Sequence, residues 1–253
     1  LRDMNDPYAV KEFEAMKKNI EEEKTRTSSW ATYRSKEVIR SLRLVVIISF
    51  LGAGCGYPVL TAFVTKLFSN WNGLTANQWS MMYGILQLIS VGTSSSIMHK
   101  FNRRTLMLVA CSFIAVIHAG TAALYCVHST YEIPHFSLII FVMLTAFSCV
   151  YAMFMFALIG ILRGELLPQS VKMIGSGWSA FVLALGSFIN TRTFLPISEA
   201  FGTEINFVIF SCSALLLAVF TYFDLPETRG KTLVEIQNEL KGVRDDKLES
   251  SHL

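Results

Sequence analysis

Residues 105–131 read TLMLVACSFIAVIHAGTAALYCVHSTY and contain no Asp, Glu, Lys or Arg. The other long runs with at most one charged residue are 44–98, 133–162, 173–191 and 205–223. An α-helix needs about 20 apolar residues to cross the hydrocarbon core of a bilayer, so each run can supply at least one crossing. We expect helices rather than strands, because barrel strands are only about 10 residues long and a helix satisfies its backbone hydrogen bonds within its own segment.

Polar breaks and breaks rich in Gly or Pro divide these runs into six candidate membrane helices. Their bounds are roughly 44–65, 79–98, 105–126, 137–161, 174–195 and 204–223. The sequence therefore predicts an all-α membrane protein with three parts. Residues 1–43 are expected to form a helical cytoplasmic linker, 44–223 a bundle of six transmembrane helices, and 224–253 a cytoplasmic tail.

The composition agrees with a membrane protein and excludes several other classes. Charged residues make up 16% of the chain, against about 25% in soluble proteins, and the mean hydropathy is +0.45. A soluble, disordered or nucleic-acid-binding chain is therefore excluded. Of the 22 Lys and Arg residues, 20 lie in the two ends and in alternate connections, and only Lys66 and Arg192 lie on the opposite side. Because Lys and Arg favour the cytoplasmic side, both ends are expected in the cytoplasm.

The spans lack the residue patterns typical of catalysis or metal binding. His118 and His128 stand alone, and His99 lies beside Lys100 at a membrane boundary. The five cysteines lie in apolar spans without CxxC spacing, so we interpret them as small apolar side chains. An enzyme needs a nucleophile or base with an orienting neighbour, and a proton relay needs Asp or Glu at mid-membrane depth. We therefore expect no enzyme, no cofactor and no bound metal.

Two polar side chains within the spans are candidates for solute binding. Gln87 lies in the middle of its span and offers both a donor and an acceptor to a hydroxylated solute. Tyr57 lies in the stretch GAGCGYP at 52–58, which loosens the first span and frees backbone groups where a solute path could run. Hydrogen bonds between helices explain the same side chains, and close helix packing explains the glycines.

Opposite charges recur where three spans are expected to reach the cytoplasmic face. The residues concerned are Arg103, Arg104, Glu165, Lys172, Glu227 and Arg229. We expect Glu165 to pair with Arg103 or Arg104. Glu227 is expected to pair with Lys172 or another cation nearby. Such pairs would form a cytoplasmic gate that closes this face of the bundle.

Residues 226–236 read PETRGKTLVEI and closely resemble the signature that follows the last helix of sugar porters in the major facilitator superfamily. Three weaker matches occur in the right order: GILQ at 84–87 with the Arg103-Arg104 pair, GELLP at 164–168, and TRTF at 191–194. The last looks most like insect trehalose and glucose facilitators. The resemblance implies the C-terminal half of a plasma-membrane transporter, two inverted three-helix repeats, alternating access, and a missing N-terminal half of six helices as its partner.

The positions that contact sugar in this family are matched less well. Where the seventh helix of the family carries Gln-Gln-Leu-Ser-Gly and a nearby Asn, this chain aligns Leu51, Gly52 and Tyr57. The Gly-Pro-x-Pro-Trp element of the tenth helix becomes FALIG at 156–160, and only Gln87 keeps a comparable polar group. The predicted substrate is a small hydroxylated solute, a sugar or polyol, carried by facilitated diffusion. The alternative is a transport-incompetent membrane sensor or partner protein.

Overall fold

The computed structural model describes residues 35–67, 75–98, 100–131, 133–231, 235–236 and 239. Most of the expected linker at 1–43 and of the expected tail at 224–253 lies outside these residues. The regular elements of the described part are all helices. They are α3 (Lys36–Gly54), α4 (Tyr57–Leu67), α5 (Ala76–Met98), α6 (Arg103–His128), α7 (Phe136–Val150), the π-helical turn η1 (Tyr151–Met155), α8 (Phe156–Leu166), the 3₁₀ turn η2 (Gln169–Val171), α9 (Lys172–Phe201) and α10 (Thr203–Asp224).

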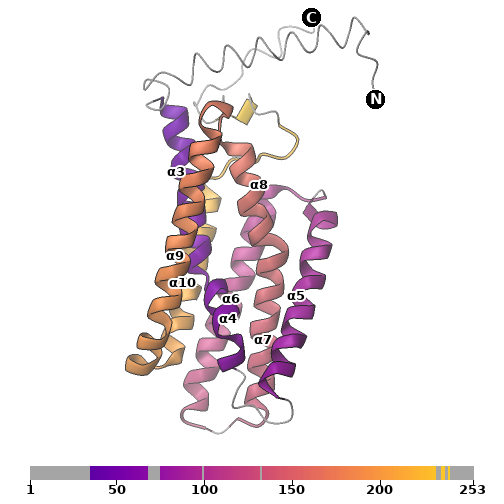
Figure 1. Ribbon diagram of the computed structural model, residues 1–253, viewed down its shortest axis with the longest axis vertical. Coiled ribbons are helices and arrows are strands. Elements are labelled where there is room, and N and C mark those ends of the chain that lie inside the picture. Colours follow the sequence, from indigo (N-terminus) through magenta and orange to yellow (C-terminus); the bar gives the residue numbers. More distant parts are fainter. Residues whose placement is uncertain are drawn as a thin grey trace, which may run out of the picture.

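The six expected spans correspond to six helical rods that run side by side (Figure 1). Within the described residues, five rods are long and apolar enough to cross a membrane: Val38–Thr65, Arg103–His128, Phe136–Leu166, Gln169–Phe201 and Thr203–Asp224. The sixth is α5, which has 23 residues but is more polar, because it carries several Gln, Ser and Thr side chains. The chain is therefore an all-α membrane protein, as the sequence predicts.

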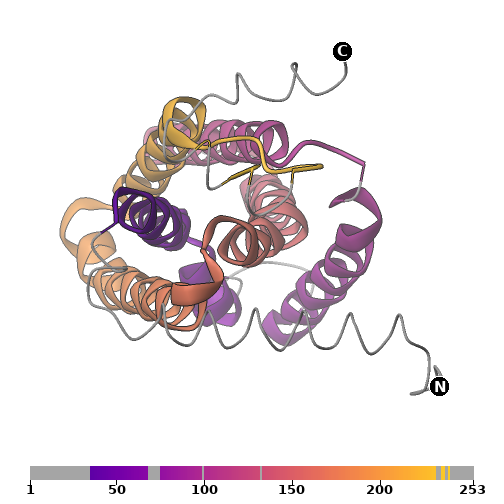
Figure 2. The same ribbon diagram turned by 90° about the horizontal axis from the view of Figure 1, so that it is seen from above.

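The rods pack around a shared apolar core. Helix α3 lies between α9 and α10, α10 packs along α6, and α5 contacts η1, α7 and α4 (Figure 2). The largest fully buried side chains include Phe147, Phe207, Met107, Leu144 and Leu158. Because lipid tails are as apolar as these side chains, close packing and hydrogen bonds between helices hold such a bundle together.

Two helices present apolar side chains outward. On α9, Trp178 is 59% exposed and Phe188 is 66% exposed, and on α5, Leu88 is 74% exposed. In the most apolar 18-residue stretch of the span Gln169–Phe201, only 11% of the residues are buried within the described structure. These faces suit contact with lipid or with another membrane helix.

The first span is broken in its middle, where α3 ends at Gly54 and α4 begins at Tyr57. Gly56 has a φ of +86°, a conformation that residues with a Cβ rarely adopt. Pro58 has no N–H, so it cannot bond to the carbonyl of Gly54 as a helix would require. The Cys55 N–H instead forms a tight turn with the Gly52 carbonyl oxygen at 3.3 Å. The break therefore removes several carbonyls from the helical hydrogen-bond ladder.

Replacing Gly56 with Ala should destabilise the bundle. A Cβ at this position would lie 2.5 Å from the Phe210 ring, and the positive φ alone costs about 1–3 kcal/mol for a residue with a side chain. Thermal unfolding of the purified protein in detergent should show a lower Tm. The control is Gly84→Ala in α5, where an added Cβ meets nothing within 4 Å. Equal Tm values for the two variants would contradict this account of the break.

Candidate functional site

Three side chains from three different helices bond to the carbonyls of the helix break. The Tyr151 hydroxyl donates to the Gly52 oxygen at 2.9 Å, and the Asn190 amide donates to the Ala53 oxygen at 2.7 Å. His118 Nε2 lies 3.0 Å from the Cys55 oxygen. Because a carbonyl oxygen only accepts, that ring nitrogen carries the proton and donates. An unpaired carbonyl inside a membrane costs several kcal/mol, so these hydrogen bonds stabilise the break.

The ring of His118 is held by aromatic side chains on the neighbouring helices. His118 is fully buried, and its ring centroid lies 4.3 Å from that of Phe147 and 5.6 Å from that of Phe210. The sequence analysis found no partner for His118 that would suggest catalysis or metal binding, and the partner in the structure is the backbone carbonyl of Cys55. A break of several glycines followed by Pro58 signals carbonyls that need donors, but it does not say which residues supply them.

The structure brings together the two residues that the sequence singled out for solute binding. The Tyr57 hydroxyl donates to Gln87 Oε1 across 3.4 Å, which joins α4 to α5. The Tyr57 ring stacks on the Tyr151 ring with centroids 4.5 Å apart and planes 9° apart. The amide nitrogen of Gln87 is buried and has no hydrogen-bond partner among the described residues. This side chain therefore keeps two N–H donors for a further acceptor.

The resulting site is uncharged, aromatic and adjacent to the break. Tyr151 connects its two parts, because its ring stacks on Tyr57 while its hydroxyl bonds to the Gly52 carbonyl. Tyr151 begins the π-helical turn between α7 and α8, a type of irregularity that is frequent at functional sites. A small number of placed polar groups on an apolar and aromatic surface is typical of sites for neutral small molecules.

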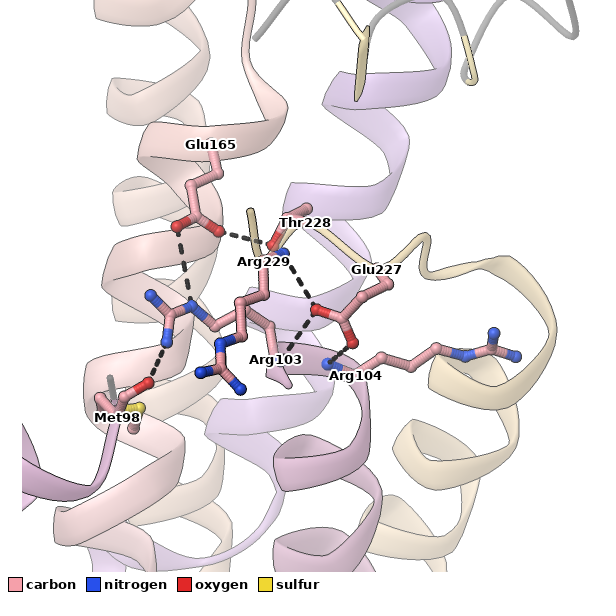
Figure 3. A network of polar contacts seen from close by, with 7 residues as sticks. All are labelled: Met98, Arg103, Arg104, Glu165, Glu227, Thr228 and Arg229. Carbon is pink, nitrogen blue, oxygen red and sulfur yellow. Dashed lines mark hydrogen bonds and ion pairs between the residues drawn. The ribbon is translucent and has the colours of Figure 1, made fainter. Parts of the chain in front are cut away.

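Five of the six predicted gate residues form a network at the N-terminal end of α6: Arg103, Arg104, Glu165, Glu227 and Arg229 (Figure 3). The Glu227 carboxylate accepts three backbone N–H groups, those of Arg103 at 3.0 Å, Arg104 at 3.2 Å and Arg229 at 3.0 Å. Two of these belong to the first turn of α6, where a negative charge also interacts favourably with the helix dipole. Glu227 thus fastens the segment after α10 to the start of α6.

Glu165, near the end of α8, joins the same network. Its carboxylate lies 3.7 Å from Arg103 Nε and accepts the Thr228 hydroxyl at 2.6 Å. Arg103 also donates to the Met98 carbonyl, so its guanidinium links α5, α6 and α8. The side chains of the pair are 12% and 29% exposed, respectively, so solvent screens them only in part. Thr228, which is buried, was missed by the sequence analysis.

The side chains of Arg229 and Arg104 have partners other than Glu227. Arg229 donates to the Lys100 carbonyl at 2.6 Å, and Arg104 donates to the Tyr222 carbonyl. The Arg104 guanidinium also lies 5.7 Å from the centre of the Tyr222 ring. In the described part of the chain, no ion pair joins Glu227 to Lys172, so the expected pairing of these two side chains is wrong. Backbone N–H groups take the role that the sequence analysis assigned to a cation.

Cysteine and histidine side chains are not grouped as metal ligands. The described residues contain no cluster of three His, Cys, Asp or Glu that could hold a metal ion. The five cysteines are free, and Cys55 and Cys111 are buried in the core. The described residues therefore present an uncharged site at a helix break and a charged network at the helix ends.

Curated relatives of the chain are named as transporters. The mouse protein "Solute carrier family 2, facilitated glucose transporter member 6" is 29% identical over 242 residues, which cover 89% of this chain and 48% of the mouse protein. "Glucose transporter GlcP" of Staphylococcus epidermidis is 35% identical over 103 residues, which cover 41% of this chain and 23% of the bacterial protein. The chain thus spans about half the length of the mouse relative.

Solved structures share the fold at low sequence identity. A double Trp mutant of XylE matches with a TM-score of 0.76 and 17% identity, covering 92% of this chain and 48% of that one. The proton:xylose symporter XylE of the major facilitator superfamily, bound to 6-bromo-6-deoxy-D-glucose, matches with a TM-score of 0.69 and 19% identity, covering 79% of this chain and 42% of that one. The family model described as "Sugar (and other) transporter" matches residues 2–240. This six-rod membrane bundle, with its uncharged polar site and charged helix ends, is a member of the sugar transporter family.

Proposed function

We propose that this chain is the C-terminal half of a facilitator that carries a small hydroxylated solute, a sugar or polyol, across a membrane by alternating access. The observation that carries the proposal is the Tyr57–Gln87 contact beside the helix break. The aromatic ring of Tyr57 suits the apolar face of a sugar ring. The N–H donors of Gln87, which have no partner among the described residues, suit sugar hydroxyls. The names of the curated relatives support the same solute class.

The partner of this half is an N-terminal half of six helices. The chain spans about half the length of its mouse relative, which supports this assignment. The outward apolar side chains of α5 and α9, such as Leu88 and Trp178, supply surfaces for helices of the other half. Solute would bind between the halves near the middle of the bilayer, and the two would rock about it.

The helix break is proposed to act as a hinge beside the solute. Motion of α4 relative to α3 changes the distance between Tyr57 and the carbonyls that Tyr151 and Asn190 hold. Contact of a solute with Tyr57 or Gln87 is thereby coupled to the packing of three other helices. Transport without ion coupling is proposed because the spans of this half carry no Asp or Glu at mid-membrane depth.

A sensor or partner protein without transport activity is the second candidate. It is favoured by the loss of family sugar contacts at Leu51, Gly52 and residues 156–160. Solute flux measured with the full-length protein separates the two candidates. A catalytic role is not proposed, because the relatives are named as transporters and the site offers no nucleophile with a base.

Both ends of the chain are proposed to lie in the cytoplasm, with the protein in the plasma membrane. In a cysteine-free variant, Thr130→Cys in the loop before α7 should react from outside the cell with an impermeant thiol reagent. Leu240→Cys should react only after the membrane is permeabilised. The physical reason is the concentration of Lys and Arg on the side of the chain ends. The reverse labelling pattern would overturn this orientation.

Replacing Gln87 with Ala should weaken solute binding by about 1–3 kcal/mol, because a solute hydroxyl and the Tyr57 hydroxyl are left without a partner. The measurement is the concentration dependence of uptake by the full-length transporter. The control is Gln78→Ala on the same helix, where the amide is exposed and bonds only near its own helix end. An unchanged uptake affinity in Gln87→Ala would make Gln87 a packing residue.

The charged network is proposed to act as a gate that holds the cytoplasmic side closed. Glu165→Gln should weaken the contact to Arg103 and shift the transporter toward the inward-open state. A loss of about 1.4 kcal/mol is a tenfold change in population. A reporter cysteine at Gly177, where an added Cβ meets nothing within 4 Å, should then react faster.

The control for the gate is Glu204→Gln at the first turn of α10, outside the network. It should leave the labelling rate of the reporter unchanged. If Glu165→Gln lowers the protein yield and leaves the labelling rate as it was, Glu165 is a structural anchor and the gating role is wrong.

A further inference from the structure

A small cavity lies between η1, α8 and α9. Its volume is about 110 Å³, and it is lined by Tyr151, Phe156, Ile159, Gly160, Arg163 and Leu183. A buried water needs only about 10–15 Å³, so the cavity accepts a group larger than one water. Gly160 lines it without a side chain, and a Cβ at that position would meet nothing within 4 Å.

Arg163 brings a positive charge into the cavity. It lies in the last turn of the membrane span Phe136–Leu166, and its Nε and Nη2 atoms are buried without a hydrogen-bond partner among the described residues. The nearby carboxylate of Glu165 is engaged by Arg103 and Thr228. An arginine in a membrane span is costly, and it usually pairs with an anion or marks a ligand path.

Arg163 is not one of the side chains that pack α8 against the core. The helix turns Leu158, Leu162 and Leu166 into the core, where each is almost fully buried. Arg163 instead shares a face with Phe156 and Gly160, at spacings of seven and three residues, and both of these are exposed. The Arg163 side chain is therefore turned away from the leucines that pack into the core, and it lines the cavity.

The cavity shares one lining residue, Tyr151, with the candidate solute site. Tyr151 lines the cavity, and the ring of the same residue stacks on Tyr57, whose hydroxyl bonds to Gln87. A solute held at Gln87 can thus extend a substituent toward Arg163 along the edge of the two tyrosines. A planar guanidinium binds a carboxylate or phosphate through two parallel hydrogen bonds, and both unpaired nitrogens here are suitable donors.

We propose that Arg163 binds an anionic substituent of the solute, so that this transporter prefers acidic sugars, which carry a carboxylate or a phosphate, over neutral ones. The inference rests on the proposed sugar-carrying function and specifies its substrate class. The neutral part of the solute is held by Tyr57 and Gln87, and the charge by Arg163. The cavity suits the anionic group alone, whereas the sugar ring lies beside the tyrosines.

The test is equilibrium binding to the purified full-length protein in a neutral detergent, with glucuronate, glucose 6-phosphate and glucose as probes. At least one of the two anions should bind roughly tenfold tighter than glucose, as expected for a charge-assisted contact. Arg163→Met should abolish that preference, while Arg163→Lys should retain part of it. Gly160→Leu, which keeps the arginine and fills the cavity, should also abolish the preference, so the test stands even if Arg163→Met folds poorly.

Several outcomes overturn the inference. Equal binding of the anions and glucose would do so, as would an anion preference that survives in both Arg163→Met and Gly160→Leu. A lipid headgroup is the other source of an anion. If Arg163→Met removes a dependence on phosphatidylserine vesicles but leaves glucuronate and glucose 6-phosphate binding intact, the site is for lipid.

Flux is measured separately in proteoliposomes that contain the same variants. Anion binding that depends on Arg163 without any flux would support the inference and reject transport as the function. Flux of glucose with no anion preference would keep the transport proposal and reject the inference. The two failures are therefore distinguishable.

Discussion

The bundle depends on hydrogen bonds between side chains of other helices and the carbonyls at the break in the first span. Water is absent from the hydrocarbon core, so each such carbonyl must find a donor within the protein. Tyr151, Asn190 and His118 supply these donors from η1, α9 and α6. Four of the six rods are thereby joined at one level, and their relative positions follow from the need to satisfy one short stretch of backbone.

This requirement also explains where the proposed solute site lies. A tyrosine that reaches a carbonyl at the break must hold its ring beside α4, and there the ring of Tyr151 stacks on that of Tyr57. The same stack leads to Gln87 on one side and to the cavity of Arg163 on the other. Tyr151 therefore combines a structural role with the proposed binding role, so its substitution should affect both the packing and the binding of solute.

The sequence alone predicts those features that the bilayer and local geometry dictate. The six spans follow from the apolar length that a crossing requires, and the break is signalled by GAGCGYP at 52–58. The donors could not be predicted, because they lie 63, 99 and 137 residues from the carbonyls to which they bond. Nothing in the sequence near His118 reveals that its partner is the Cys55 carbonyl. Gln87 and Tyr57 were found because polar side chains are rare in such spans, but their mutual contact needed the fold.

The charged network shows a second limit of prediction from sequence. Its geometry also determines which substitutions the network tolerates. Charged residues can be counted in a sequence. The sequence does not reveal that the backbone N–H groups at the start of a helix bind a carboxylate. Because Glu227 bonds to the main chain at positions 103 and 104, that attachment does not depend on which side chains stand there. Any residue with an N–H can replace Arg104 without releasing Glu227. Proline cannot, so this pair of positions should exclude a residue that is otherwise well suited to the first turn of a helix.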